Sequence, residues 1–229
     1  MRVSENLPRP KHPDSKRRCV LLLSGGIDSA TSLWLKKRES YEVVTLSVLF
    51  HNRNEREVDA SRTLARKAGV KLHLECSLPY LREAVDLDEG LRSRLESKNI
   101  PSTLIPYRNL IFYSLGSYFA VVNDCSTVVV SHNKDDIGRF PDVSHEFVQK
   151  INELLILGAP DVPITVEAPL LNYRKEDVFA LAVELGVPLS DTWSCWGTAE
   201  FHCGRCLGCE TRKRLFASFG LRDDTVYIR

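Results

Sequence analysis

The sequence lacks any long apolar run and any excess of charge of one sign. No segment approaches the roughly 20 apolar residues that a helix needs to span a bilayer, so we expect no membrane association. The 31 basic and 30 acidic residues give a formal net charge of +1, which argues against direct nucleic-acid binding over a large surface. The polar, proline-rich segment 1–18 lacks the apolar stretch of a secretory signal. We therefore expect a flexible N-terminal leader and a cytoplasmic protein.

The remaining composition is that of an ordinary globular protein, with 43% hydrophobic and 27% charged residues. The 229 residues suffice for one large α/β domain, alone or with a small appendage, and for a core that needs no disulfide bonds. Cysteine is unevenly distributed along the chain. Cys19, Cys76 and Cys125 stand alone and are expected to pack as core residues, whereas four others cluster near the C-terminus.

Predicted strands and helices alternate along the chain. Apolar or β-rich runs predict strands at 19–23, 43–50, 71–75, 127–130 and 165–167. Helical patterns cover 29–38, 55–68, 109–122, 144–157 and 174–185, and the charged segment 78–102 is predicted to be irregular with helical turns. This alternation predicts the α/β class with a doubly wound parallel sheet, in which ligands bind outside the carboxyl ends of the strands.

The junction between the first strand and the first helix has the form of a phosphate-binding loop. Its glycines let the backbone turn tightly and approach an anion, and the N–H groups and dipole of the helix N-terminus face that anion. An aspartate cannot favour phosphate directly, so we expect Asp28 to bind Mg²⁺ or to orient the loop. The predicted phosphate-binding residues are Leu23, Ser24, Gly25, Gly26, Ile27, Asp28 and Ser29.

Two other interpretations of this junction are open. The Gly-Lys-Ser/Thr pattern of a Walker loop is absent, so a kinase-like site for the γ-phosphate is not indicated. A glycine turn whose aspartate and serine merely cap the helix is the simpler structural alternative. The full hexapeptide 24–29, placed between a strand and a helix, favours the phosphate loop over both.

The four C-terminal cysteines, Cys195, Cys203, Cys206 and Cys209, have the spacing of a metal site. Two overlapping Cys-x-x-Cys steps suit a tetrahedral Zn²⁺, which prefers thiolate ligands. Four protein ligands leave no open position, so we expect the zinc to be structural. Buried free thiols and a redox-active Cys-x-x-Cys pair are the alternatives.

Together, the loop and the four-cysteine site resemble the 7-cyano-7-deazaguanine synthases of queuosine and archaeosine biosynthesis, in the N-type ATP pyrophosphatase superfamily. The matching blocks are 100–109, 167–175, 185–188, 192–195 and 202–213. The resemblance implies a Rossmann-like fold similar to that of the adenine nucleotide hydrolases. It divides the chain into an ATP pyrophosphatase domain at 19–170 and a helical zinc-binding region at 171–229 packed on that domain. It also implies a homodimer.

The resemblance further implies a reaction and assigns the predicted phosphate-binding residues 23–29 to ATP. ATP would drive the conversion of 7-carboxy-7-deazaguanine and ammonia to 7-cyano-7-deazaguanine through an acyl-adenylate and an amide, with Mg²⁺ and a structural Zn²⁺ present. The predicted catalytic residues are Asp28, Arg108 and Lys175, of which the two cations would neutralise charge on the α-phosphate. The predicted substrate-binding residues are Asp136, Arg139, Asp142 and Glu146.

The chain departs from the family pattern where the substrate pocket is expected. The segment 136–147 lacks the family's aromatic and Cys-Arg positions, 51–54 stands in place of a Tyr-Gly-Gln run, and Tyr107 replaces a glycine. Two alternatives within the superfamily therefore stay open. One is a carboxylate–amine ligase that stops at an amide or couples a deazapurine acid to another amine. The other is a tRNA-modifying ATP pyrophosphatase, and a non-enzymatic zinc-binding partner protein is a third, unrelated alternative.

Overall fold

The computed structural model describes residues 17–97, 105–197 and 199–228. In these ranges, five parallel strands form one sheet in the order β3-β2-β1-β4-β5. The strands are β1 (Arg18–Leu22), β2 (Glu42–Phe50), β3 (Leu72–Leu78), β4 (Thr127–Val129) and β5 (Thr165–Glu167). The predicted leader at 1–18 falls almost wholly outside the described residues, as does part of the matching block at 100–109.

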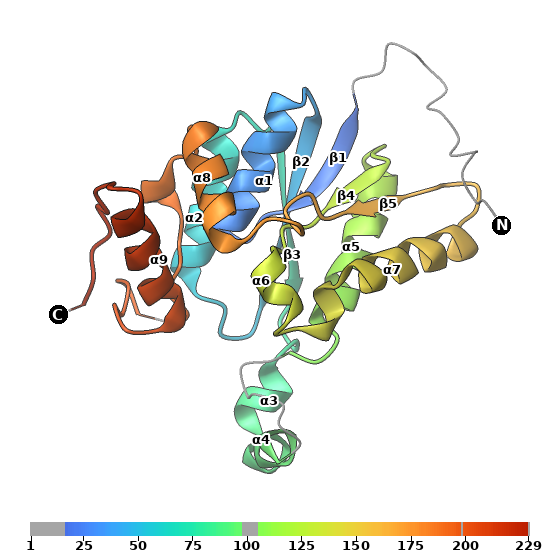
Figure 1. The fold of residues 1–229 in the computed structure, drawn as a ribbon. Helices are drawn as coiled ribbons and strands as arrows, with labels where there is room; N and C mark the ends of the chain where they lie inside the picture. Colours follow the sequence, from blue (N-terminus) through green and yellow to red (C-terminus); the bar gives the residue numbers. More distant parts are fainter. Residues whose placement is uncertain (1–16, 98–104, 198, 229) are drawn as a thin grey trace.

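Helices cover both faces of the sheet (Figure 1). One face carries α1 (Ile27–Arg38), α2 (Glu55–Lys67), α8 (Lys175–Glu184) and α9 (Leu207–Ser218), and the other carries α5 (Arg108–Val122) and α7 (His145–Gly158). The side chains of β1 alternate between the two cores, with Cys19 and Leu21 in the first and Val20 in the second. Because both faces are covered, the strand is a continuous apolar run rather than an alternating one.

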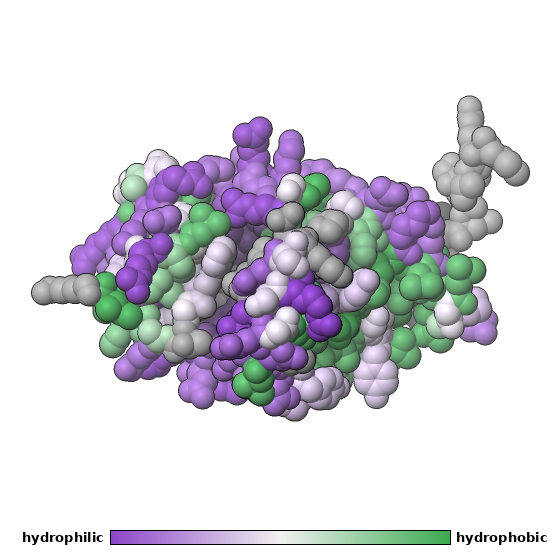
Figure 2. Space-filling view, turned by 90° about the horizontal axis from the view of Figure 1, so that it is seen from below, coloured by the Kyte–Doolittle hydropathy of each residue, from purple (hydrophilic) through white to green (hydrophobic). Residues whose placement is uncertain are grey.

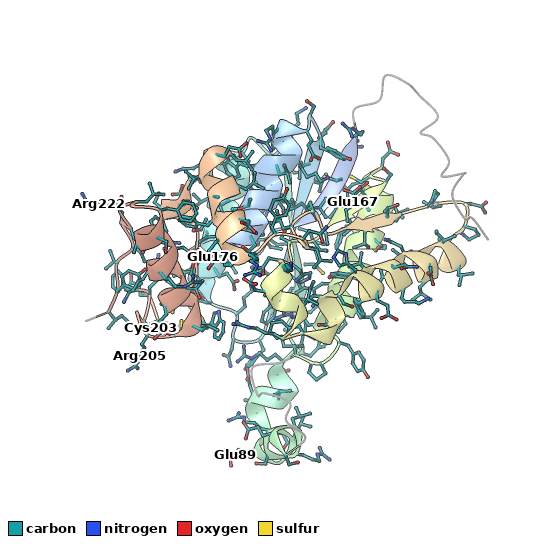
Figure 3. All side chains as sticks on the ribbon, in the orientation of Figure 1. Glu89, Glu167, Glu176, Cys203, Arg205 and Arg222 are labelled. Atoms are coloured by element: carbon teal, nitrogen blue, oxygen red, sulfur yellow. The ribbon has the colours of Figure 1, made fainter. Side chains whose placement is uncertain are left out.

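The remaining helical segments are short. α3 (Glu83–Leu87) and α4 (Glu89–Glu96) project from the body of the protein beyond the end of β3 (Figure 1). Glu89 marks the first residue of α4 in Figure 3, and α4 has no buried residue. α6 (Lys134–Ile137) and the 3₁₀ turns η1 (Pro141–Val143) and η2 (Leu189–Asp191) complete the described elements. Within the described ranges, every helix is too short or too polar to cross a membrane.

The direction of winding reverses at β1, which lies between β2 and β4. In an open α/β sheet, such a reversal leaves a crevice at the carboxyl ends of the two strands concerned. The loop that follows β1 enters this crevice, and so does the segment that follows β4. The topology therefore brings two stretches about a hundred residues apart in the sequence to one place, because their strands are neighbours.

The predicted α/β class and parallel sheet are confirmed. The predicted strands and helices agree with the observed elements except at their ends, where β3 extends to Leu78 and α1 begins at Ile27. Gly69 and Gly186 follow α2 and α8 with φ of 64° and 68°, the left-handed conformation that glycine supplies at a helix end. The segment 78–102, predicted to be irregular with helical turns, contains the short helices α3 and α4.

Candidate functional site

A pocket of about 480 Å³ lies at the carboxyl edge of the sheet, where β1 and β4 end. Its walls come from the loop after β1, the end of β2, the start of α5, the segment after β4, the start of α8, the segment 193–196 and α9. Every predicted ATP-binding residue except Gly25 lines this pocket, as do Arg108 and Lys175. The sequence motifs that were predicted to act together therefore meet at one cavity.

Gly25 lies in the tight turn of the loop, and the backbone of Glu57 lies too close to it for any side chain to fit. Its φ is 97°, and a Cβ atom at this position would lie 2.3 Å from the backbone oxygen of Glu57. Ser24 Oγ lies 3.0 Å from Ser29 Oγ and accepts a hydrogen bond from Gly26 N at 3.2 Å. Gly26 is the N-cap residue of α1 and no side chain caps that helix end. The alternative in which Asp28 or a serine merely caps the helix therefore does not describe this loop.

Lys175 and Asp28 form an ion pair inside the pocket. Lys175 Nζ lies 2.6 Å from both carboxylate oxygens of Asp28, and Asn133 Nδ2 donates to Asp28 Oδ2 at 3.2 Å. The backbone N–H of Lys175 also donates to Asp135 Oδ2 at 3.0 Å. The first turn of α8 is therefore bonded both to the loop after β1 and to the segment after β4. This arrangement delivers an ammonium group beside the helix N-terminus, where an anion would bind.

Arg53 is a further cation in the wall of the pocket, and it was not among the residues predicted for the site. Its guanidinium, on a side chain that is 6% exposed, donates to Ser24 O at 2.8 Å and to Val48 O. It also forms an ion pair with Glu57. Burial raises the pKa of the Glu57 carboxyl, and the positive charge of Arg53 opposes this rise. Arg53 thus fixes the ends of β1 and β2 to each other. The only signal in the sequence was the replacement of the family's Tyr-Gly-Gln run at 51–54.

Arg108 occupies the first position of α5, at the wall of the pocket. The preceding Tyr107 has a φ of 56°, the left-handed conformation that favours glycine. A non-glycine residue adopts this conformation at a cost of about 1–2 kcal/mol. The structure therefore explains why the family pattern has a glycine before this arginine, and shows that the tyrosine is accommodated by strain in the turn.

The predicted substrate-binding residues divide into two groups. Asp136 and Arg139 line the pocket, whereas Asp142 and Glu146 are not among its lining residues and Glu146 is exposed. Asp136 Oδ2 accepts from Asn133 N at 3.1 Å, and burial raises the pKa of the Asp136 carboxyl. The assignment of these four residues to substrate remains a prediction.

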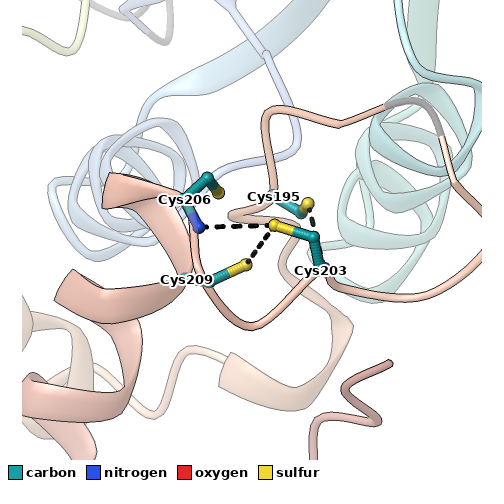
Figure 4. A group of neighbouring side chains, drawn as sticks. All are labelled: Cys195, Cys203, Cys206 and Cys209. Atoms are coloured by element: carbon teal, nitrogen blue, oxygen red, sulfur yellow. Dashed lines mark hydrogen bonds between the residues drawn. The ribbon is translucent and has the colours of Figure 1, made fainter. Parts of the chain in front are cut away.

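The four C-terminal cysteines form a compact sulfur cluster near α9 (Figure 4). All four Sγ atoms lie within 4.8 Å of one another, and Cys203 Sγ and Cys209 Sγ are 3.9 Å apart. That separation excludes a disulfide and matches the edge of about 3.8 Å expected for a ZnS₄ tetrahedron with Zn–S bonds of about 2.3 Å. Among the described residues, no second group of three Cys, His, Asp or Glu side chains meets as closely.

Backbone N–H groups donate to two of the four sulfur atoms, whereas burial raises the pKa of Cys195 and Cys209. Cys203 N and Gly197 N each donate to Cys195 Sγ at 3.3 Å, and Cys206 N donates to Cys203 Sγ at 3.3 Å. The N–H groups of Arg205 and Cys206 lower the pKa of Cys203 to about 6. Figure 3 shows Cys203 and Arg205 at the base of α9. The donor set therefore fits a thiolate-preferring metal ion such as Zn²⁺.

A buried arginine connects the cysteine region to the pocket. Arg212 of α9 is 1% exposed, and its guanidinium donates to Thr192 Oγ1 at 2.8 Å and to Leu189 O at 2.8 Å, while it pairs with Asp223 at 3.2 Å. The segment that it holds continues to Trp193, whose N–H donates to the carbonyl of Gly25 at 2.9 Å. The hydrogen bonds of Arg212 and Trp193 therefore link α9 to the loop after β1.

The isolated cysteines pack as predicted in two cases and less deeply in the third. Cys19 and Cys125 are buried, and burial raises the pKa of their thiols to about 12 and about 11. Cys76 is half-buried. The first two thiols are protonated at neutral pH and are poor nucleophiles, which argues against a sulfur-transferring enzyme that would use them.

The loop after β1 stands at the reversal point of a parallel sheet with the Lys175–Asp28 pair beside it, and in an open α/β protein this is the usual place for a ligand. A solved structure of NMN synthetase from Francisella tularensis has this fold, with a TM-score of 0.53 at 18% identity over 91% of this chain and 79% of that one. At that identity the likeness concerns the fold alone.

The family follows from the sequence comparison. The model of the queuosine biosynthesis protein QueC matches residues 18–220, and this chain belongs to that family. A 7-cyano-7-deazaguanine synthase from a Nitratiruptor species is 30% identical over 217 residues, covering 92% of this chain and 98% of the relative. The synthase of the same name from Nostoc punctiforme is 32% identical over 222 residues, covering 92% and 99%. The predicted resemblance to this family is confirmed.

Proposed function

We propose that this protein is a 7-cyano-7-deazaguanine synthase that uses ATP to convert 7-carboxy-7-deazaguanine and ammonia to the nitrile. The observation that carries the proposal is the pocket itself. Its phosphate loop and its Lys175–Asp28 pair stand at the reversal point of the sheet, in a chain whose family match spans 18–220. This chain aligns with nearly the whole length of two relatives that are named 7-cyano-7-deazaguanine synthase.

The chemistry proposed for the first half-reaction is adenylation of the acid. The substrate carboxylate attacks the α-phosphorus of ATP, the bond to the β-phosphate oxygen breaks, and pyrophosphate leaves with the electron pair. The N–H groups at the start of α1 and the hydroxyls of Ser24 and Ser29 would hold the phosphates. Arg108 and Lys175 would stabilise the charge that develops at the α-phosphate, and Asp28 would hold the ammonium group of Lys175 in place.

The second half-reaction is proposed to use the same groups. Ammonia displaces AMP from the acyl-adenylate and leaves an amide. The amide oxygen attacks the α-phosphorus of a second ATP and releases pyrophosphate, and loss of AMP and a proton then forms the nitrile. Both oxygen atoms of the acid leave on AMP, so no oxidant or reductant is required.

Two metal ions are proposed to assist this protein in different ways. Mg²⁺ would be held mainly by the ATP phosphates, with the carboxylates of Asp28, Asp135 and Asp136 as the protein oxygens available at the pocket wall. It would neutralise phosphate charge when bound. Zn²⁺ would be held by the four cysteines and would have no open coordination position, so its contribution would be to structure.

The proposed reaction is tested by mass spectrometry of the products formed from purified protein, ATP, Mg²⁺, ammonium and 7-carboxy-7-deazaguanine. We expect 7-cyano-7-deazaguanine, with about two AMP and two pyrophosphate per nitrile if both adenylation steps occur as described. The amide alone would identify a ligase that stops one step earlier. No conversion of this acid, together with ATP–pyrophosphate exchange supported by another acid, would contradict the proposal.

We also propose that the protein is a homodimer, which the family resemblance implies. Exposed apolar side chains gather on α5 and α7, and Figure 2 shows hydrophobic residues on the side of the molecule that carries these helices. They are Tyr118, Val121 and Val122 on α5 and Leu154, Ile156 and Leu157 on α7. A surface of this kind in water is typical of an interface between protein chains.

The proposed dimer predicts a mass of about twice 25.9 kDa in light scattering coupled to size exclusion. Replacing Leu154 and Leu157 together by glutamate is expected to give a monomer, because two charges would be desolvated at the interface. Replacing the exposed Lys150 of the same helix by glutamate is the control, and that variant should remain a dimer. A monomeric wild-type protein would contradict this prediction.

A further inference from the structure

Two residues that line the pocket each carry a buried hydroxyl group that has no hydrogen-bond partner among the described residues. One is the phenol of Tyr113 on α5, a residue that is 1% exposed. The other is Ser131 Oγ, in the segment that follows β4. A buried hydroxyl that makes no hydrogen bond costs about 1–3 kcal/mol, so such groups are rare without a reason. In a pocket wall, the reason is a bound molecule that supplies the partner.

The tyrosine and the histidine in this wall are uncharged at neutral pH, and the charges of Arg108 and Asp142 lie close enough to shift the pKa of both. The ring of His132 lies 6.1 Å from that of Tyr113, and burial lowers the pKa of His132 to about 4, so the imidazole is neutral with one donor and one acceptor nitrogen. Burial also raises the pKa of Tyr113, which keeps its proton. Tyr113 and His132 therefore offer neutral hydrogen-bonding groups to a ligand in this part of the pocket.

The same region offers apolar surface for a flat ring. Its apolar lining residues are Phe112, Val130, Phe140 and Val143. Apolar walls with a few convergent hydroxyl and imidazole groups are the usual form of a site for a heterocyclic small molecule. The cations Arg53, Arg108 and Lys175 belong to the same pocket, so a molecule with one anionic end and one neutral polar edge fits it as a whole.

The position of Ser131 indicates which of the two substrates reaches these hydroxyls. The phosphate loop leaves β1, and β4 is the strand next to β1, so Ser131 lies beside the loop on the β4 side. In the proposed reaction, the acid presents its carboxylate to the α-phosphate from beside the phosphate loop. The wall that α5 and the end of β4 provide is then within reach of its ring.

We propose that Tyr113 and Ser131 bind the polar edge of the deazapurine ring of the acid, and so select a heterocycle that carries a carbonyl and N–H groups. This inference rests on the proposed function. Neither residue was among the predicted substrate-binding residues. The two hydroxyls make hydrogen bonds only in the complex, so they contribute to recognition of the acid and not to the stability of the free protein.

The test measures the affinity of wild-type protein and of the variants Tyr113→Phe and Ser131→Ala for two ligands by isothermal titration calorimetry. The ligands are 7-carboxy-7-deazaguanine, titrated with and without a saturating α,β-methylene analogue of ATP, and that analogue alone. Each variant is expected to bind the acid about tenfold more weakly, since one ring atom loses its partner on desolvation. Affinity for the ATP analogue should be unchanged. Tyr80→Phe, at an exposed tyrosine that does not line the pocket, is the control and should bind both ligands as the wild type does.

Thermal unfolding of the ligand-free variants separates recognition from structure. Tyr113→Phe should unfold at the wild-type temperature or above it, because its hydroxyl makes no bond to lose in the free protein. If both variants bind the acid as tightly as the wild type, the inference is overturned and the proposed function stands. Weaker binding of the ATP analogue instead would place the adenine here and would also overturn the inference. A wild-type protein that does not bind the acid would contradict the proposed function, and this inference with it.

Discussion

Replacing Lys175 by alanine is expected to reduce nitrile formation by about 10²–10³-fold, the scale of losing one preorganised charge at a reacting phosphate. The structure places Lys175 Nζ 2.6 Å from Asp28, at the N-terminal end of α1 where the phosphates are proposed to bind. Its side chain is only 23% exposed, so water replaces its charge poorly. The loss should appear in kcat more than in KM for the acid, because the charge it opposes develops during phosphoryl transfer.

The control for this prediction is Lys134→Ala. Lys134 is an exposed lysine on α6. It is adjacent in sequence to residues that line the pocket but does not line the pocket itself, so its replacement should leave kcat unchanged. Asp28→Asn is a second probe, since the amide would keep the shape of the side chain but would hold the ammonium group less firmly. Rates are measured by AMP release at saturating ATP. A Lys175→Ala variant with the rate of the wild type would show that the lysine serves only to pair with Asp28.

The local features of this site could be predicted from sequence because each has a local cause. The loop at 24–29 is confined to one strand–helix junction, and the structure supplies the reason for Gly25, whose φ of 97° and contact with Glu57 exclude a side chain. The four cysteines fall within fifteen positions of one another, and their spacing alone predicts that their sulfur atoms meet. In both cases the sequence separation is small enough for backbone geometry to decide the contact.

Features that depend on long-range contacts could not be predicted in this way. Lys175 and Asp28 are 147 positions apart, and only the family resemblance pointed to the lysine. Arg53 lies in a segment with no helical or strand period, and its role appears only when β1 and β2 bring Ser24 and Val48 within reach of one guanidinium. The unpartnered hydroxyl of Tyr113 is equally invisible, because a tyrosine in an apolar helix is expected to be a core residue.

Loss of the metal from the cysteine cluster is expected to have the largest effect on stability. We expect purified protein to contain about one zinc per chain, and Cys206→Ser to lose it. Removing a structural metal ligand belongs to the few changes that cost about 4 kcal/mol or more. For a chain of this size, each kcal/mol lowers Tm by about 2–4 °C, so a fall of about 10 °C is expected. Metal analysis and differential scanning calorimetry on the same samples give both quantities.

The effect should extend to the pocket, because the cluster holds the start of α9 and α9 carries Arg212. Arg212 fixes the segment whose Trp193 N–H binds the carbonyl of Gly25, so release of the cluster should disorder the phosphate loop and weaken ATP binding. Cys76→Ser is the matched control, a single cysteine on β3 away from the cluster, and it should keep both zinc and ATP affinity. A Cys206→Ser protein that has lost its zinc but unfolds at the wild-type temperature would refute the structural role. A catalytic role for the metal is the alternative to a structural one. The four cysteines argue against it, because four protein ligands leave no coordination position for a substrate.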